Sequence, residues 1–425
     1  MAAAGALLVL LGPSEWEGPL VAGLAHPASR VVIERRCLDT ADLLATAEAG
    51  RGNVAVVGAD APRLDADVVA RVRSFGVSVI GVVGPGQDEA AQRLARWGAD
   101  TVVAVDPGEL GPAVAAIAAA AARAASGETA EVVALPVPDD DAGAGRVLAV
   151  WGPAGAPGRT SVAIAVADEA ARAGLEALVV DADTWAPSVT VLLGVVDDGA
   201  GLASACRRAL AGTLDAGTLA ALARQVRPGL RVLPGLPRSG RWNEVRAAAL
   251  TEVVRVARSV ADLVVVDCGF SLESDEDLVF DTDAPRRNGA TFAALESADL
   301  VLAVGLADPV GLVRLVNGLS ELAEVVPGAD RRVVVTRLRE SLVGRRGAAS
   351  VAEALHVHAG LDALWCVPDD RAAYDAALRA GRTLADVSPS SPARVVLRGI
   401  TRELMRDLDL RGDAVPAAAG AQRAR

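Results

Sequence analysis

The chain has few aromatic residues, no lysine and only four cysteines. Of its 425 residues 3% are aromatic, and all 42 basic residues are arginine. Cys37, Cys206, Cys268 and Cys366 lie far apart and form no Cys-x-x-Cys pair. This pattern argues against a disulfide framework and favours free, buried thiols in a reducing cytosol.

An excess of positive charge and long apolar runs are also missing. The net charge is −12 and the pI is about 4.9, whereas tight nonspecific binding to DNA needs a basic surface. No uncharged apolar run reaches the roughly 18 residues of a membrane span. The apolar start, Met1–Leu11, has no basic flank and is interpreted as a strand rather than a signal peptide. We therefore expect a cytoplasmic protein.

What the chain does have is enough apolar sequence for large cores. Hydrophobic residues make up 52% of it, and the mean hydropathy is +0.34. A run of proline, glycine and aspartate over 136–145 is typical of a linker. We predict a first domain over 1–130, a linker over 131–145, a second domain over 146–410 and an Ala/Gly-rich, disordered tail over 411–425.

Short apolar runs alternate with helix-like segments throughout the first domain. The runs are Ala6–Leu11, Arg30–Glu34, Asn53–Val57, Val77–Val83 and Thr101–Val105. Strands that alternate with helices indicate βαβ units, and therefore a parallel sheet with helices on both faces.

Near-continuous apolar runs recur in the second domain, as expected for parallel strands buried on both faces. They are Val147–Val150, Ala177–Val180, Arg231–Leu233, Leu263–Val266, Leu300–Val304, Val333–Val335 and Leu364–Val367. The predicted fold class is α/β, with a five-stranded parallel domain followed by a doubly wound, mostly parallel one.

The five βα units of the first domain resemble the receiver domain of two-component signalling. A working receiver needs acidic residues after strand one, an aspartate at the end of strand three and a lysine after strand five. Here these places hold Gly12–Ser14, Gly58 and Asp106. Asp60 is two residues out of register. It remains open as a phosphoacceptor, but we favour a degenerate receiver used for docking or dimerisation.

A glycine-rich turn between a predicted strand and a predicted helix is the most informative motif. It comprises Trp151–Ser161, with the sequence WGPAGAPGRTS. Backbone N–H groups in such a turn, together with the helix N-terminus, form a phosphate cradle. Against the template G-x-x-x-x-G-K-[ST], Pro153 replaces the first glycine and Arg159 replaces the lysine. The predicted nucleotide-binding residues are Gly152, Gly155, Gly158, Arg159, Thr160 and Ser161.

Carboxylates follow two later strands. Asp181 and Asp183 follow the apolar run Ala177–Val180, the first run after the glycine-rich turn, or P-loop, and its predicted helix. Asp267 follows the run Leu263–Val266, and an apolar run that ends in aspartate is the Walker B pattern. Carboxyl ends of strands form the ligand-binding rim of a doubly wound sheet. Asp267 and the Thr160 hydroxyl are therefore predicted to hold magnesium.

These motifs, in this order, resemble the MinD/ParA group of deviant-Walker P-loop ATPases. The chain is more closely similar to the CpaE/TadZ and Ssd (septum-site-determining) branch, which carries a degenerate receiver ahead of a MinD-like domain. The resemblance extends to about residue 410. It implies ATP or ADP and Mg²⁺ as cofactors, Asp183 and Arg159 as catalytic residues, and Asp181 near the metal. Asp183, at the family's interval after Arg159, would position the attacking water.

The chain also departs from that family. The signature lysine of the P-loop is replaced by Ala154, and Pro153 and Pro157 each remove a backbone N–H. Loss of one such donor typically costs about 10²–10³ in rate, so weak or absent hydrolysis is expected. Two alternatives stay open: Arg286 and Arg287, at the end of the acidic loop 273–283, supply the missing cation, or no nucleotide binds.

The resemblance implies a role as well as a ligand. It points to a spatial regulator of the division septum or of Tad/Flp pilus assembly, switched by ATP between monomer and homodimer. Its partners would be proteins of the division or pilus-secretion machinery, with peripheral contact to the inner membrane left open. The alternative is a ParA-type DNA-segregation ATPase, against which the acidic balance and Ala154 both argue.

Two further positions carry expectations from the resemblance. Thr336 stands where an asparagine usually contacts the base, which puts adenine specificity in doubt. MinD proteins hold the membrane with a C-terminal amphipathic helix. Here the helix predicted over Ala393–Leu410 has acidic residues that offset its arginines, so we expect its apolar stripe to pack on the core.

Overall fold

The computed structural model describes residues 5–126, 145–195, 199, 201–273, 286–344, 346–361 and 364–411. The chain divides into two compact units, whose described parts are separated by residues 127–144. All but residue 145 of the predicted linker and all but residue 411 of the predicted tail fall outside the described residues. Both units are α/β, and the predicted fold class is confirmed.

The first unit contains a five-stranded, fully parallel sheet in the order β2-β1-β3-β4-β5. Its strands are β1 (Ala6–Leu10), β2 (Val32–Arg36), β3 (Val54–Gly58), β4 (Ser78–Val83) and β5 (Thr101–Ala104). This strand order is one of the two common doubly wound arrangements, in which the order reverses between β1 and β3.

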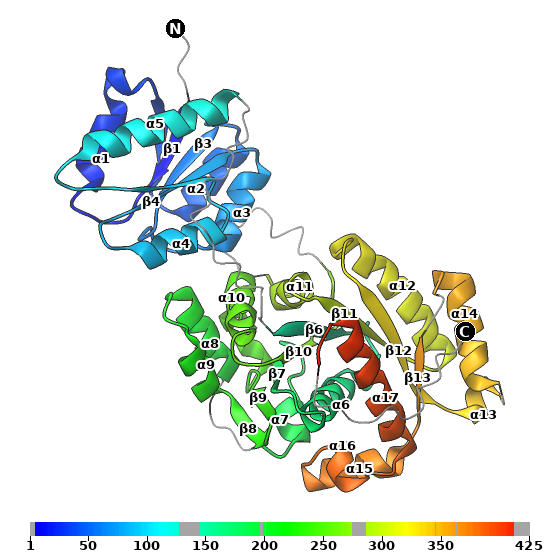
Figure 1. Ribbon diagram of the computed structural model, residues 1–425. Helices are drawn as coiled ribbons and strands as arrows, with labels where there is room; N and C mark the ends of the chain where they lie inside the picture. The colour runs from blue at the N-terminus through cyan, green and yellow to red at the C-terminus, as the bar shows by residue number, and fades with distance from the viewer. Residues whose placement is uncertain are drawn as a thin grey trace. The chain divides into compact units, whose positions relative to one another are not determined.

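Helices cover both faces of this sheet (Figure 1). One face carries α1 (Glu17–Ala25) and α5 (Leu110–Ser126), and the other carries α2 (Thr40–Glu48), α3 (Ala66–Ser74) and α4 (Asp88–Arg96). Successive strand residues serve opposite faces, because side chains alternate along a strand. Leu7 and Val9 face α1 and α5, whereas Leu8 and Leu10 belong to the core under α2, α3 and α4.

The second strand starts later than predicted. A short 3₁₀ turn, η1 (Pro27–Ser29), precedes it and ends at Arg30, which adopts the left-handed conformation with φ +61°. That backbone conformation cannot continue into a strand. Pairing therefore begins at Val32, opposite Ala6, and not at Arg30.

The second unit is built on an eight-stranded sheet in the order β13-β12-β11-β6-β10-β7-β9-β8. The strands are β6 (Arg146–Trp151), β7 (Ala177–Ala182), β8 (Arg224–Arg227), β9 (Leu230–Leu233), β10 (Leu263–Cys268), β11 (Leu300–Leu306), β12 (Arg331–Leu338) and β13 (Trp365–Pro368). All neighbours are parallel except β8, which pairs antiparallel with β9 at the edge. The prediction missed β8, because its four residues include two arginines and a glutamine and form no apolar run.

Helices again form a layer on each face of the sheet (Figure 1). One layer contains α6 (Arg159–Arg172), α7 (Val189–Leu192), α15 (Arg371–Ala380), α16 (Leu384–Val387) and α17 (Pro392–Asp407). The opposite layer contains α8 (Gly201–Leu210), α9 (Ala216–Leu222), α10 (Ala247–Ala257), α11 (Gly289–Glu296), α12 (Pro309–Val325) and α14 (Gly347–Ala359). Two short helices, η2 (Ser239–Glu244) and α13 (Glu340–Val343), complete the unit.

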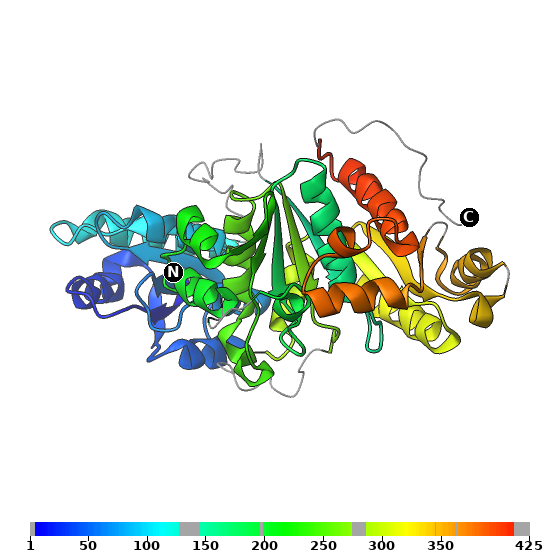
Figure 2. The ribbon, with the colours of Figure 1, turned by 90° about the horizontal axis from the view of Figure 1, so that it is seen from below.

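The C-terminal helix α17 packs along α6 (Figure 2). Its apolar stripe, which includes Leu397, Ile400 and Leu404, is fully buried in the core beneath that layer. Arg394 adds a charged contact, since its Nε donates to a Glu169 carboxylate oxygen on α6 at 2.6 Å. The stripe therefore packs on the core, as predicted. No helix among the described residues is long and apolar enough to cross a membrane.

The four cysteines are free thiols. Cys37, Cys206 and Cys268 are buried as predicted, whereas Cys366 is only half-buried. Burial raises the pKa of the Cys37 and Cys366 thiols to about 11 and that of Cys206 to about 12. They remain protonated at neutral pH and are poor nucleophiles.

Candidate nucleotide site at the carboxyl edge of the second sheet

The structure brings the predicted motifs to one edge of the second sheet. The glycine-rich turn connects β6, a central strand, to α6. Asp181 in β7 and Asp267 in β10 stand opposite each other in register, and β10 lies directly beside β6. The carboxyl ends of parallel strands share an edge, so both carboxylates lie at the rim where the turn begins.

The turn delivers the amino end of α6 to this rim. Gly158 immediately precedes the helix and has φ +105°, a conformation open to glycine and strained for other residues. Arg159, Thr160 and Ser161 form the first turn of α6, whose leading backbone N–H groups have no partner within the helix. An amino end of this kind favours an anion, because unpaired N–H groups and the helix dipole act together.

Arg159 points back into the turn. Its Nη1 donates to the Gly152 carbonyl oxygen at 2.8 Å and lies 3.5 Å from that of Pro153. Its Nη2 lies 3.5 Å from Asp183 Oδ2, in an ion pair whose side chains are only 15% and 4% exposed. The guanidinium therefore joins the beginning of the turn to the first carboxylate beyond β7.

Thr160 and Asp267 are in direct contact. The Thr160 hydroxyl donates to Asp267 Oδ2 at 2.7 Å, and the Ser188 hydroxyl approaches Thr160 Oγ1 at 3.4 Å. Asp181 uses one oxygen, Oδ2, to accept from the Val189 N–H at 3.1 Å. The other oxygens of Asp181 and Asp267 are buried and have no hydrogen-bond partner among the described residues. Two buried carboxylate oxygens at this rim thus lack a donor.

Burial governs the electrostatics of these carboxylates. Loss of solvation raises the pKa of Asp267 to about 7, against the opposing effects of the Thr160 hydroxyl and Arg159. Burial, together with the neighbouring Asp267 charge, holds the pKa of Asp181 well above its usual range. Burial therefore disfavours the charged forms of Asp181 and Asp267, which Arg159 alone does not stabilise, and a bound cation would favour the charged carboxylates.

Asp183 is fixed by the turn that follows β7. Its Oδ1 accepts from the backbone N–H groups of Trp185 and Ala186 at 2.9 and 3.0 Å. Its Oδ2 faces Arg159, as described above. The Asp183 carboxylate is thus held at the rim in a defined orientation and is 4% exposed.

The sequence did not identify the contacts made by the residues after Asp183. The Arg287 guanidinium lies 3.8 Å from the centre of the Trp185 ring and donates to the Thr184 hydroxyl at 3.0 Å. Trp185 Nε1 donates to the Asn288 side-chain oxygen at 3.0 Å. The segment ahead of α11 is therefore attached to the loop that carries Asp183. Arg287, predicted as a replacement cation, contacts this loop, and the exposed Arg286 makes no hydrogen bond or ion pair with the P-loop among the described residues.

Thr336, at the position where the resemblance places a base-contacting asparagine, is bonded within the protein. It is 5% exposed, and its hydroxyl donates to the carbonyl oxygens of Pro157 at 2.8 Å and Gly305 at 3.0 Å. The side chain thus links the P-loop to β11 and is already satisfied within the protein. Of the acidic loop predicted over 273–283, all but Glu273 lies outside the described residues.

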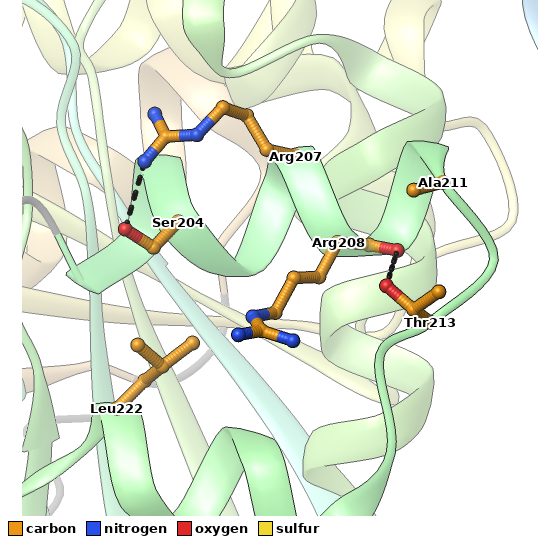
Figure 3. Close-up of a pocket in the computed structure, with 6 residues that line it drawn as sticks. All are labelled: Ser204, Arg207, Arg208, Ala211, Thr213 and Leu222. Atoms are coloured by element: carbon orange, nitrogen blue, oxygen red, sulfur yellow. Dashed lines mark hydrogen bonds between the residues drawn. The ribbon is translucent and has the colours of Figure 1, made fainter.

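A shallow cavity of about 360 Å³ lies elsewhere in the second unit (Figure 3). It is lined by Ser204, Arg207, Arg208, Ala211, Thr213 and Leu222, from α8, α9 and the turn between them. Arg207 donates to Ser204 Oγ at 2.9 Å and pairs with Glu244 at 2.7 Å. The cavity lies on the sheet face opposite α6 and contains none of the predicted site residues.

The site and the fold define an α/β P-loop arrangement, and solved structures share it. A ParA family ATPase from Chlorobium tepidum TLS is 17% identical with a TM-score of 0.52, over 61% of this chain and 99% of that one. The septum site-determining protein MinD from Pyrococcus horikoshii OT3, complexed with Mg-ADP, is 16% identical with a TM-score of 0.50, over 63% and 99%. No protein-family model and no curated protein matches the chain. At these identities the likeness shows the fold alone.

Proposed function

We propose that the second unit binds ATP or ADP together with Mg²⁺ and acts as a nucleotide-dependent switch that positions other proteins. The contact between the Thr160 hydroxyl and Asp267 carries this proposal, together with the partnerless oxygens of Asp181 and Asp267 beside the amino end of α6. A purely structural rim would be expected to satisfy such groups internally, because each unmet buried polar group costs about 1–3 kcal/mol.

The residues at the rim fit Mg²⁺. They offer hard oxygen donors, namely two carboxylates and one hydroxyl, which is the donor type that Mg²⁺ prefers. Among the described residues no three acidic, histidine or cysteine side chains are arranged to hold a metal by themselves. That agrees with Mg²⁺, which usually takes one or two protein carboxylates and completes its shell with phosphate oxygens and water. Mg²⁺ bound here would neutralise phosphate charge.

The proposed phosphate-binding elements are the glycine-rich turn and the amino end of α6. The Gly158 conformation aims the leading N–H groups of α6 at the rim, and Arg159 supplies a permanently charged guanidinium. Arg159 now bonds to the Gly152 carbonyl and faces Asp183, so a nucleotide would take over part of its hydrogen bonding. A planar guanidinium suits phosphate, although it is longer than the lysine of the template.

Hydrolysis is proposed to be slow or lost. Pro153 and Pro157 cannot donate to a phosphate, which removes two potential donors from the cradle. Asp183 is the proposed residue that orients an attacking water, but one of its oxygens is held by two N–H groups and the other faces Arg159. Both features favour a state that retains ATP over one that turns it over quickly.

We further propose that the chain belongs to the CpaE/TadZ and Ssd branch, with a degenerate receiver over 1–130, a linker over 131–145, a nucleotide domain over 146–410 and a tail over 411–425. The strand order of the first unit supports a receiver-like fold, and the residues at Gly58 and Asp106 support docking rather than phosphotransfer. The role would be to place a division septum or a pilus machine through a homodimer. Membrane contact, if made, would need segments other than the buried stripe of α17.

Sedimentation equilibrium combined with a turnover assay tests the switch. We expect ATP with Mg²⁺ to promote a dimer that ADP does not, and we expect turnover to be slow in the wild type and slower in Asp183→Ala. An unchanged monomer–dimer equilibrium in ATP, ADP and nucleotide-free protein would contradict the switch. Tight binding to DNA in a low-salt filter assay would favour the ParA-type alternative instead.

A further inference from the structure

Helix α12 lies against the P-loop from the sheet face opposite α6. Asp308 fixes its start, because Oδ1 accepts from the Gly311 N–H at 2.7 Å. Further along, a Cβ added to Gly318 would come within 3.0 Å of the Trp151 ring and 3.1 Å of Pro153 Cβ. This close approach brings one side of α12 onto the beginning of the P-loop.

Arg314 lies one helical turn before Gly318 and therefore on the same side of α12. Its Nη1 is 3.5 Å from the Ala154 carbonyl oxygen. A Cβ on Gly155, which has φ +74°, would lie only 2.2 Å from that nitrogen. The guanidinium thus rests directly on the backbone of the P-loop, and glycine at position 155 leaves the room for it.

Among the described residues no carboxylate neutralises the charge of Arg314. Its side chain is exposed and makes no ion pair with any carboxylate of the described residues. Arg159, which reaches the P-loop from α6, already faces Asp183 and stands near the buried Asp267. A nucleotide would add further negative charge to this rim. Arg314 is placed to pair with that charge from the sheet face opposite α6.

Resting on the proposed function, we propose that Arg314 is the second phosphate-binding cation of this site, supplied by α12 of the same chain. Its guanidinium binds the phosphates of the nucleotide and favours the triphosphate over the diphosphate, because the triphosphate carries more charge. Arg287 already contacts Thr184 and Trp185, and the exposed Arg286 makes no hydrogen bond or ion pair with the P-loop among the described residues, so neither is assigned this role.

Calorimetric titration with ATP and with ADP, each with Mg²⁺, tests this assignment in the full-length protein. Arg314→Ala is expected to weaken ATP binding about tenfold, the size of a lost charge-assisted hydrogen bond, and ADP binding less. Arg314→Lys should keep most of the affinity, and Arg314→Glu should lose more than Arg314→Ala. A steric role would not follow this order of charge. The dependence of ATP affinity on salt should also decrease in Arg314→Ala.

Arg406→Ala is the matched control. Arg406 is an exposed arginine in the last turn of α17, next to Asp407. Asp407 pairs with Arg332 at the start of β12, so this end of α17 lies at the edge of the sheet opposite the candidate site. Its removal changes the net charge equally and should leave ATP affinity unchanged. Equal ATP affinity in Arg314→Ala, Arg314→Glu and wild type would overturn the role of Arg314 while leaving nucleotide binding intact. A wild type that binds neither nucleotide would overturn both proposals.

Discussion

The two units have similar architecture, but the carboxylates at the edge where their parallel strands end differ in burial. Each has a parallel or mostly parallel sheet with helices on both faces, and the parallel strands of each sheet end in loops at one edge, the carboxyl edge. At the carboxyl edge of the first sheet, Gln87 Nε2 donates to Asp60 Oδ2 at 3.2 Å, and this exposed hydrogen bond joins two loops. At the same edge of the second unit, Asp181, Asp183 and Asp267 are each at most 4% exposed.

That difference shows where function resides in such folds. The described buried carboxylate of the first unit, Asp65, caps a helix by accepting from the Val68 N–H at 3.0 Å. In the second unit the buried carboxylates of Asp181 and Asp267 leave oxygens without donors among the described residues. The same layered architecture accommodates both edges, so the strand order alone assigns no activity. Hydroxyls of the first unit, those of Ser14 and Thr40, also lack partners in the described part of the chain, so it is the unmet acidic oxygens of the second unit, rather than unmet polar atoms in general, that mark an edge suited to a cation.

The largest effect is expected from Arg159→Ala. This change leaves the buried Asp183 without its counter-charge and removes the bond to the Gly152 carbonyl. Breaking a buried pair from one side typically costs about 3–5 kcal/mol, and the free energy of unfolding from urea titration should fall by about 3 kcal/mol. Affinity for ATP should fall as well.

Arg36→Ala in the first unit is the comparison. Arg36 pairs with Glu17 at 2.5 Å, but its side chain is 57% exposed, so its loss should cost less than about 1 kcal/mol. The double variant Arg159→Met with Asp183→Asn should recover much of the stability lost in Arg159→Ala. Equal losses for the buried and the exposed arginine would remove the contrast between the two edges.

Asp267→Asn should separate stability from binding. Because burial raises the Asp267 pKa to about 7, the folded protein binds more protons than the unfolded chain between about pH 4 and pH 7. The free energy of unfolding without ligand should therefore decline as the pH rises through this window. Removal of the charge should stabilise the ligand-free protein by about 1–3 kcal/mol at pH 8.

The same substitution should abolish the dependence of ATP affinity on Mg²⁺, because asparagine is a poorer ligand for a hard cation. Thermal unfolding at pH 5 and pH 8 checks the stability, and calorimetry with Mg²⁺ or a chelator checks the binding. A variant that is less stable than wild type at pH 8, or that still needs Mg²⁺, would show that Asp267 has a purely structural role.

The smallest effect is expected from Asp60→Asn. The carboxylate contacts Gln87 at 3.2 Å in an exposed position, and surface changes of this kind usually alter stability by less than about 0.5 kcal/mol. ATP affinity should not change. Incubation with labelled acetyl phosphate should leave no label on the wild type. Label retained by the wild type and lost in Asp60→Asn would restore phosphotransfer to the first unit.

Much of the fold and the core of the site could be predicted, because both depend on local patterns. Apolar runs identified the strands buried on both faces, and turn residues placed Gly158 and Thr160 at the start of a helix. The edge strand β8 carries polar residues and gave no such signal. The contacts of Arg314, Thr336 and Trp185 with the P-loop or the neighbouring loops could not be predicted, because they join residues more than 100 positions apart.

Direct calorimetric titration of the wild-type protein with ATP, in the presence of Mg²⁺ and again with a chelator, tests the central claim most directly. One ATP should bind per chain with Mg²⁺, and the affinity should fall sharply when the metal is removed. The absence of binding at millimolar ATP in both conditions would contradict a nucleotide site at this edge.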